Sequence, residues 1–135
     1  MRIVLFLLVM FMFQSCFNVR STQHFAYTKL SPLDYQQELS KAKDYYLIDV
    51  RTAGEYRKGH VEGAVNYSYL KFNFAKKVEA LDRKKTVFIY CQTCHRSPFC
   101  ARILKRKGFA TVYDIKKGYI KWHKAKLPEV QLSNE

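Results

Sequence analysis

Three cysteines fall within ten residues, in the stretch CQTCHRSPFC from Cys91 to Cys100. A cysteine thiolate binds metals, forms disulfides or acts as a nucleophile, and each role needs different neighbours. A zinc site needs four ligands, and CQTCH offers three crowded candidates without a second Cys-x-x-Cys pair elsewhere. The sequence therefore favours a nucleophile or a redox pair, and we expect neither a metal nor a cofactor.

The surroundings of Cys91 suit a nucleophile. Cys91 ends the apolar run VFIYC, and the Ser97-Pro98 pair, typical of a helix start, follows six residues later. A helix N-terminus and the amides of a bent loop both stabilise an anion. Arg96 adds a fixed positive charge. The thiolate, which is the reactive form of cysteine, is therefore favoured at Cys91.

Helix and strand signals alternate along the rest of the chain, whose length suits one domain. Short apolar runs predict strands over residues 45–50, 63–68, 86–91 and 111–115. Capping residues and apolar periodicity predict helices over residues 31–42, 52–59, 70–81, 97–108 and 118–125. This order predicts an α/β domain with a mostly parallel central sheet flanked by helices. In such a sheet, sites form at the carboxyl ends of the strands, where Cys91 lies.

Three segments resemble the rhodanese family, in the same order and spacing. They are LIDVRTAGEYRKGHVEGAVN (residues 47–66), VFIYCQTCHRS (87–97) and LKRKGFATVYDIKKGYIKW (104–122). With the first helix, the resemblance covers residues 30–128, which leaves residues 129–135 as a C-terminal tail. It implies a three-layer rhodanese-like domain, similar to the small periplasmic sulfurtransferases.

By position, the resemblance implies that Cys91 is the catalytic residue of a thiosulfate sulfurtransferase. The thiolate takes the sulfane sulfur of a small anionic donor such as thiosulfate, and a thiol or cyanide acceptor removes it from the resulting persulfide. The next five residues form the cradle around the sulfur, and Arg96, with His95, orients the donor. The cradle residues are Gln92, Thr93, Cys94, His95 and Arg96. Four more residues are expected to support the site: Asp49, Arg51, Glu55 and Ser97.

The supporting residues have structural roles in this interpretation. In the family, an ion pair between the arginine after the first buried strand and a nearby acid supports the active-site side of the sheet. Asp49, Arg51 and Glu55 supply such residues here. We expect this role for them, in preference to direct contact with the donor.

The loop length separates sulfur transfer from phosphate chemistry. Related phosphatases place five residues between the cysteine and the arginine, whereas four residues separate Cys91 from Arg96. The smaller ring of amides suits a sulfur atom better than a phosphoryl group, so a phosphatase is disfavoured.

Cys94 departs from the family pattern, which commonly has glycine at this position. Glycine adopts a left-handed backbone without steric cost, whereas cysteine does not. Cys94 is then either an inert residue in an altered cradle, or a partner that forms a disulfide with Cys91 or resolves its persulfide. The second reading makes the protein an exported thiol-disulfide or persulfide-carrier protein. A non-catalytic rhodanese-like binding module is a further alternative, which the intact Cys91 and Arg96 disfavour.

The N-terminus predicts export. Arg2 precedes eleven apolar residues, Ile3 to Phe13, which are fewer than the ~20 of a spanning helix and suit a secretory signal over residues 1–15. Ser15 before Cys16 resembles the bacterial lipoprotein box, although that box usually has leucine where Phe13 stands. We expect lipidation at Cys16, a tether over residues 16–29, and a location in the cell envelope or periplasm on a membrane. An ordinary cleaved signal is the alternative.

The formal net charge of +13 is large for 135 residues. Such a charge favours anionic small molecules, anionic lipid surfaces or nucleic acid as partners. The chain has no nucleic-acid-binding motif, and its lysines are scattered among helices and loops. The charge therefore fits an anionic sulfur donor, and nucleic acid is not expected.

Overall fold

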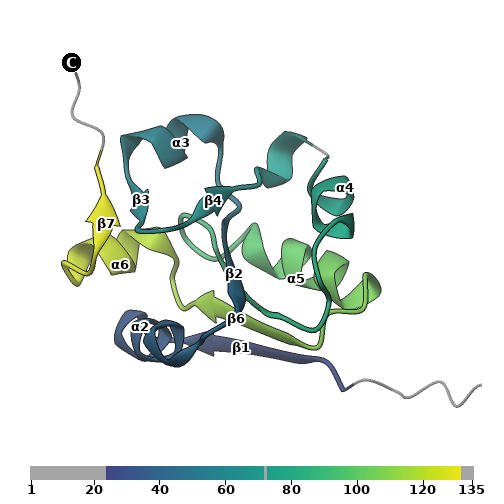
Figure 1. Cartoon of the computed structure of the whole chain (residues 1–135). Coiled ribbons are helices and arrows are strands. Elements are labelled where there is room, and N and C mark those ends of the chain that lie inside the picture. Colours follow the sequence, from purple (N-terminus) through teal and green to yellow (C-terminus); the bar gives the residue numbers. More distant parts are fainter. Residues whose placement is uncertain (1–23, 72, 132–135) are drawn as a thin grey trace, which may run out of the picture.

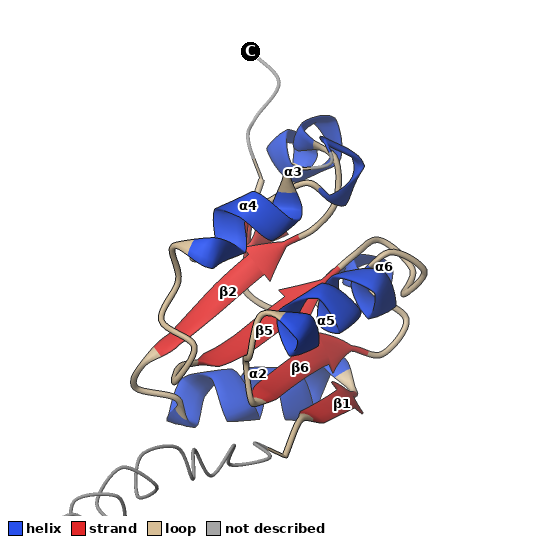
Figure 2. Cartoon of the chain, turned by 90° about the vertical axis from the view of Figure 1, so that its right-hand side faces the viewer, coloured by secondary structure: helices blue, strands red, loops and turns tan. Residues whose placement is uncertain are grey.

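Five parallel strands form the central sheet of the computed structural model, which describes residues 24–71 and 73–131. Their order across the sheet is β1-β6-β5-β2-β4; Figure 1 labels β1, β6, β2 and β4, and Figure 2 labels β5 between β2 and β6. The strands are β1 (Ala26–Leu30), β2 (Tyr45–Asp49), β4 (Val65–Asn66), β5 (Thr86–Tyr90) and β6 (Thr111–Ile115). The predicted α/β architecture with a parallel sheet is confirmed.

Helices cover both faces of this sheet, which makes three layers (Figure 2). One face packs against α4 (Phe74–Glu79) and α5 (Ser97–Arg106). The other face packs against α2 (Pro32–Lys41) and α6 (Tyr119–Lys124). Because both faces are covered, the central strands are continuous apolar runs, as the sequence shows for β2 and β5.

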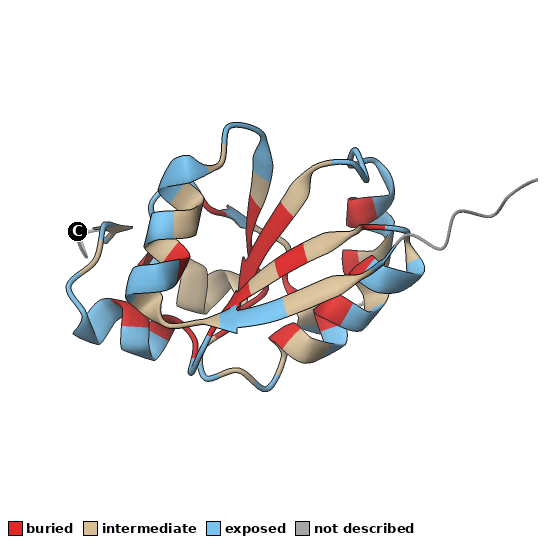
Figure 3. Cartoon of the chain, turned by 90° about the horizontal axis from the view of Figure 1, so that it is seen from below, coloured by how far each residue is buried: buried red, intermediate tan, exposed pale blue. Residues whose placement is uncertain are grey.

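The core has two halves, one on each face of the sheet. Successive side chains of a strand point to opposite faces. Val87 and Ile89 of β5 accordingly join the cluster that contains Leu104 of α5. Phe88 and Tyr90 join the cluster that contains Trp122 of α6. Figure 3 shows the buried residues along the middle of the sheet and the exposed ones on the outer faces of the helices.

Local capping explains where two helices begin. The Ser31 side chain accepts a hydrogen bond from the Asp34 amide at 3.2 Å, and Pro32 opens α2. Thr52 and Glu55 form a reciprocal capping box at the start of α3 (Ala53–Lys58). Both predicted helix starts are confirmed.

The helix predicted over residues 70–81 is two shorter elements. A 3₁₀ turn, η2 (Tyr69–Lys71), precedes α4, which begins after Asn73. Phe74 and Val78 are buried as the periodicity predicts, but Leu70 is 53% exposed. The apolar stripe therefore begins at Phe74, and a single helix through Leu70 has no core to pack against.

The domain extends beyond the predicted boundaries at both ends. Ala26–Leu30 lies mostly in the segment assigned to the tether, yet it forms β1 and pairs with β6. Glu129–Val130, in the expected tail, forms β7 and pairs with β3 (His60–Val61). These short strands are held by main-chain hydrogen bonds to a partner, and their own sequences carry little apolar pattern.

The expected signal over residues 1–15 and the expected lipidation site at Cys16 lie outside the described residues. Within residues 24–71 and 73–131, no helix has the length and apolar character needed to cross a membrane.

Candidate functional site

Cys91 lies directly after β5, in the middle of the carboxyl edge of the sheet. Its strand is flanked by β6 and β2, and the loop after it leads into α5. Cys91 is fully buried, whereas Thr93 and His95 in the loop are exposed. The sulfur therefore lies beneath the loop, at the place where parallel α/β sheets form their sites.

Two groups approach the sulfur of Cys91. The Cys94 main-chain amide donates a hydrogen bond to Sγ at 2.9 Å, and the Ser97 hydroxyl lies 3.4 Å from Sγ. Among the described residues, Cys94 supplies the one main-chain N–H that reaches the sulfur. Fewer residues than expected therefore contact the sulfur: of residues 92–96, Cys94 contributes an amide, and the other polar contact is the Ser97 hydroxyl.

Cys94 has a φ of +91°, in the left-handed region that side chains other than glycine rarely adopt. This is the position at which the family commonly has glycine. The conformation directs the Cys94 amide at Cys91 Sγ. The backbone of Cys94 is therefore strained, and this strain lies directly beside the Cys91 sulfur.

Ser97 has a role that its place at a helix start does not predict. It is the first residue of α5, after Arg96 at the cap position, and it makes no capping hydrogen bond. Its hydroxyl instead donates to Asp114 Oδ2 at 2.7 Å. Ser97 thus connects the sulfur of Cys91 to a buried carboxyl group.

Asp114 is a site residue that the sequence analysis missed. It lies in β6 and is fully buried, and its Oδ2 also accepts a hydrogen bond from the Tyr27 hydroxyl of β1 at 2.5 Å. Burial raises the pKa of Asp114, because a carboxylate loses its hydration there. The available signal was one acidic residue inside the apolar run TVYDI.

Arg51 pairs with Asp49 beneath the loop. Both side chains are buried, and the guanidinium donates to both carboxylate oxygens, with Nη2 to Oδ2 at 2.7 Å. A third donor, Nη1, reaches Gln92 Oε1 at 3.0 Å. The guanidinium carbon also lies 3.9 Å from the centre of the Tyr119 ring. Arg51 therefore joins the end of β2 to the Cys91 loop.

Glu55 is the ion-pair partner of Arg96, and within the described part of the chain Arg51 pairs with Asp49 instead. Two parallel hydrogen bonds of 2.8 and 2.7 Å join the Arg96 guanidinium to the Glu55 carboxylate. Arg96 is the main cause that lowers the pKa of Glu55, to about 2. The charge of Arg96, which we expected to orient a donor, is thus engaged by an acid here. His95 hydrogen-bonds Thr93 at 2.9 Å.

The segment after β6 fixes the backbone of the Cys91 loop. The Tyr119 amide donates to the Cys91 carbonyl at 2.8 Å, and the Ile120 amide donates to the Gln92 carbonyl at 3.2 Å. Gly118 has a φ of +68°, and a Cβ there would lie 2.5 Å from both carbonyl oxygens. Only glycine permits this close approach of two backbones.

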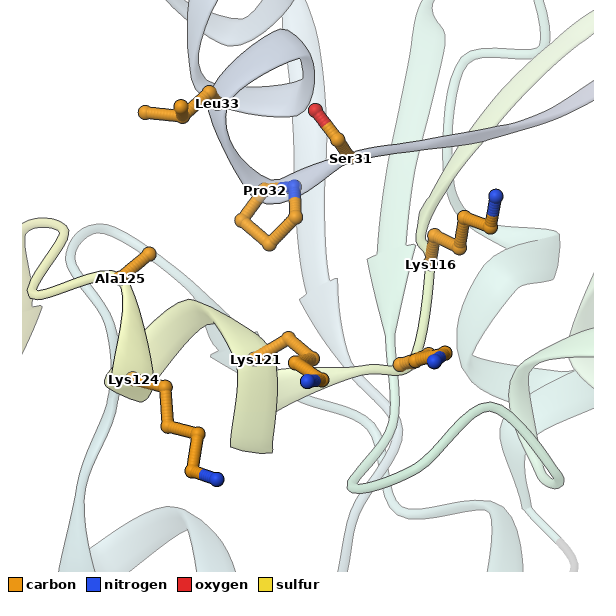
Figure 4. A pocket seen from close by; sticks show the side chains of 8 residues that line it. Ser31, Pro32, Leu33, Lys116, Lys121, Lys124 and Ala125 are labelled. Carbon is orange, nitrogen blue, oxygen red and sulfur yellow. The ribbon is translucent and has the colours of Figure 1, made fainter.

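Two hollows lie near this edge of the sheet. One, of about 360 Å³, is lined in part by Arg51, Gln92 and Tyr119. The other, of about 380 Å³, lies between the start of α2 and α6 and contains four lysines (Figure 4). Its lining includes neither Cys91 nor the loop after it, and the lysines are Lys116, Lys117, Lys121 and Lys124. The first hollow is therefore the one that adjoins the candidate site.

The three described cysteines, Cys91, Cys94 and Cys100, are free thiols. In the described part of the chain, no three histidine, cysteine or acidic side chains gather in a way that could hold a metal.

Several known proteins are similar to this chain in sequence. The chain is 31% identical over 96 residues to the thiosulfate sulfurtransferase GlpE of Coxiella burnetii, which covers 71% of this chain and 87% of that protein. It is 37% identical over 76 residues to the protein YqhL of Bacillus subtilis, covering 56% of this chain and 59% of that protein. A tRNA uridine(34) hydroxylase of Aster yellows witches'-broom phytoplasma is 33% identical over 106 residues, which are 76% of this chain and 33% of the hydroxylase. The chain thus spans less than two thirds of some relatives.

Solved structures share the fold. The polysulfide-sulfur transferase homodimer of Wolinella succinogenes matches with a TM-score of 0.66 and 29% identity over 82% of each chain. A rhodanese-like domain from Anabaena matches with a TM-score of 0.67 and 18% identity, over 77% of this chain and 79% of that one. The sequence model of the rhodanese-like domain matches residues 31–125. Because this match covers most of the chain, the protein belongs to the family of rhodanese-like domains.

Proposed function

We propose that this protein is a sulfurtransferase, which moves a sulfane sulfur from an anionic donor such as thiosulfate to a thiophilic acceptor through a persulfide on Cys91. The observation that supports it most is the position of Cys91 Sγ. The sulfur lies at the carboxyl end of the central strand, with an amide at 2.9 Å and a hydroxyl at 3.4 Å. The amide donates to the sulfur and stabilises the anions that sulfur transfer requires.

The proposed cycle has two steps. The Cys91 thiolate attacks the outer sulfur of thiosulfate, a new S–S bond forms, and sulfite leaves with the electron pair of the bond that breaks. A thiolate or cyanide then attacks the terminal sulfur of the persulfide, and the electron pair returns to Cys91 Sγ. The Cys94 amide stabilises negative charge on the sulfur, both when the thiolate attacks the donor and when it leaves in the second step.

The site must open before a donor reaches the sulfur. Cys91 is fully buried, and the exposed residues above it are Thr93 and His95. Arg96, at the end of this loop, is paired with Glu55 of α3, so an anionic donor competes with this carboxylate for the guanidinium. Movement of the loop between Cys91 and α5 therefore belongs to the proposed cycle.

Relatives support sulfur transfer as a class of activity. Proteins named thiosulfate sulfurtransferase and polysulfide-sulfur transferase are among them, at 31% and 29% identity. A putative sulfur carrier protein, YrkF of Bacillus subtilis, is 27% identical over 88 residues, 65% of this chain and 46% of that protein. The choice of thiosulfate as donor rests on the anionic character of that donor and the positive charge of this protein.

The test is the formation of thiocyanate from thiosulfate and cyanide. We expect turnover by the parent protein, none by Cys91→Ser, and unchanged turnover by Cys100→Ala. Cys100 is a buried thiol on α5 that packs in the core, so it controls for the loss of a thiol alone. Equal turnover by the parent and Cys91→Ser would remove the proposal.

Cys94 favours a second candidate, a thiol-disulfide or persulfide-carrier protein that uses both Cys91 and Cys94. Its main-chain amide already contacts Cys91 Sγ, and both side chains are free thiols. Mass spectrometry of protein purified without reductant separates the two functions. A loss of two hydrogens mapped to Cys91 and Cys94 supports the redox protein, whereas a gain of one sulfur on Cys91 supports transfer.

We also propose that the protein is exported and held on a membrane by a lipid on Cys16. The support is the sequence of the N-terminus, in which a short apolar run ends in Ser15-Cys16. In this location, the donor and acceptor are small molecules or thiols of the cell envelope.

A further inference from the structure

A continuous line of polar contacts runs from the catalytic sulfur into the core. It starts at Cys91 Sγ, passes through the Ser97 hydroxyl and ends at Asp114 Oδ2, over distances of 3.4 and 2.7 Å. All three residues are buried. The elements that carry them are neighbours, since β5 pairs with β6 and α5 packs on both (Figure 2).

Asp114 is an unusual residue for this position in the core. No lysine or arginine of the described residues lies within ion-pairing distance of its carboxyl group. Its Oδ1 is buried without a hydrogen-bond partner. A permanently ionised carboxylate with one unpartnered oxygen would be costly there, whereas a carboxyl group that takes up a proton is not.

The single hydrogen of the Ser97 hydroxyl couples the protonation of Cys91 to that of Asp114. Ser97 has one hydroxyl hydrogen, and it donates to only one neighbour at a time. When it donates to the Asp114 carboxylate, the 3.4 Å contact is a hydrogen bond only if Cys91 is a thiol that donates to Ser97 Oγ. When it donates to a thiolate at Cys91, the 2.7 Å contact is a hydrogen bond only if Asp114 is protonated and donates to Ser97 Oγ.

We propose that Cys91 and Asp114 share one proton through the Ser97 hydroxyl, and that Asp114 is a positioning residue that holds the proton while the sulfur is an anion. The sulfur proton moves to Ser97 Oγ, and the proton of Ser97 moves to Asp114 Oδ2. The pair keeps one proton and one negative charge throughout, and no water needs to enter the buried site.

The consequence for sulfur transfer rests on the proposed function. Attack of the thiolate on the donor leaves a persulfide anion in the cradle and releases sulfite. Because Asp114 then holds the proton, the buried site contains one anion, the persulfide. Without the transfer, it would contain a persulfide and a carboxylate only two hydrogen bonds apart, which repel each other in a medium of low dielectric constant.

Other groups that face Asp114 do not replace it in this role. Raised pKa values keep the tyrosine hydroxyls and the Cys100 thiol protonated, and the ammonium group on β1 favours the carboxylate form of Asp114. The groups are Tyr27 and Lys29 on β1, Tyr35 on α2, and Ser97 and Cys100 on α5.

The test is a pH titration of the ultraviolet absorbance of the Cys91 thiolate, taken as the difference between the full-length parent and Cys91→Ser. Two groups that share a proton titrate in two steps. We expect two steps with a plateau in the parent protein and a single step in Asp114→Asn. At the pH that is the midpoint of the upper step in the parent, we expect the Cys91 thiol of Asp114→Asn to be fully ionised. In this variant, the thiolate forms without a carboxylate beside it. Tyr27→Phe is the control, because it removes the other hydrogen-bond donor to Asp114 Oδ2 but leaves the Asp114 carboxyl group. We expect its titration to show two steps, as in the parent.

A single step in the parent, or two steps in Asp114→Asn, would overturn the shared proton. An infrared measurement on the parent protein covers the case in which Asp114→Asn does not fold. On the plateau, we expect both the S–H band of a thiol and the C=O band of a protonated carboxyl group, and absence of the carboxyl band contradicts the proposal. Neither experiment uses a sulfur donor, so the shared proton and the sulfurtransferase activity can fail independently.

Discussion

Cys94 is the residue of the site whose own conformation is strained. Its φ of +91° costs a side chain about 1–2 kcal/mol, which glycine does not incur. We expect Cys94→Gly to raise the free energy of unfolding by about 0.5–1 kcal/mol, after the greater chain entropy of glycine is subtracted. Urea denaturation of the protein measures this change.

Cys94→Ala is the control for this prediction, because alanine removes the thiol and keeps the strained φ. It should leave the stability close to that of the parent. Equal stabilisation by alanine and glycine would show that the thiol, and not the backbone conformation, is unfavourable. If Cys94 is inert in sulfur transfer, both variants retain thiocyanate formation.

The position of the proposed nucleophile, Cys91, can be predicted from sequence better than the residues that contact it. Cys91 lies between an apolar strand and a helix start, and both are local patterns that the sequence shows directly. Asp114 and Tyr27 reach the site only because β1 and β6 pair side by side, far apart in sequence. The partner of Arg96 also depended on the fold, because α3 brings Glu55 to the loop after β5. Such contacts need the topology before they can be predicted.

At the scale of elements, the ion pair between Arg96 and Glu55 joins the start of α5 to α3. Its carboxylate has a pKa of about 2, below the ordinary value, so its stabilisation is complete above pH ~4.5 and is lost as the pH falls toward 2. Allowing for partial exposure, we expect it to contribute about 1–2 kcal/mol.

Glu55→Gln tests this pH dependence. Between neutral pH and about pH 3, the free energy of unfolding should fall less in the variant than in the parent, because the variant has no carboxylate to protonate there. Glu62→Gln is the matched control, since Glu62 is exposed and makes no ion pair within the described residues. Parallel curves for the parent and Glu55→Gln, measured by denaturant unfolding, would contradict the assignment.

The junction between β6 and α6 holds the backbone of the Cys91 loop. In Gly118→Ala, the added Cβ meets two carbonyl oxygens at 2.5 Å, and both belong to the loop or to Cys91 itself. We expect a loss of about 2–4 kcal/mol in the free energy of unfolding and a larger loss of sulfur transfer, because the loop must shift. Denaturant unfolding and thiocyanate formation are the measurements.

Gly63→Ala separates the steric effect from the backbone effect. Gly63 also has a positive φ, of +80°, but nothing lies within 4 Å of an added Cβ. Its alanine variant should lose only the cost of the left-handed conformation, less the smaller chain entropy of alanine, which leaves about 0.5–1 kcal/mol, and keep its activity. Equal losses in both variants would mean that close packing at Gly118 is unimportant.

The elements found from sequence are those with a pattern of their own. The central strands β2 and β5 are buried on both faces, so each is an apolar run, and α2 and α3 carry capping residues. The edge strand β1 and the short β7 are stabilised by pairing with a neighbour, and nothing in their residues alone requires a strand. Local patterns therefore predict the middle of this domain better than its edges.

At the scale of the whole molecule, the described domain begins close to the expected anchor. The strand β1 starts at Ala26, so about ten residues separate it from Cys16. An extended chain spans at most about 3.3–3.6 Å per residue, which limits this connection to about 35 Å. A lipid on Cys16 would therefore keep the domain, with its large positive charge, near the membrane surface.

This arrangement predicts that the full-length protein, expressed in a bacterial host, takes up radiolabelled palmitate and stays with the membrane fraction. Cys16→Ser should lose the label and leave the membrane, while the thiocyanate activity of the domain is kept, because Cys16 lies outside residues 30–128 assigned to it. Globomycin, which blocks the lipoprotein signal peptidase, should cause the unprocessed form to accumulate. A parent protein that is cleaved without incorporating label has an ordinary secretory signal. We then expect any membrane binding that remains to be electrostatic attraction of the positively charged protein to anionic lipid, which added salt would abolish.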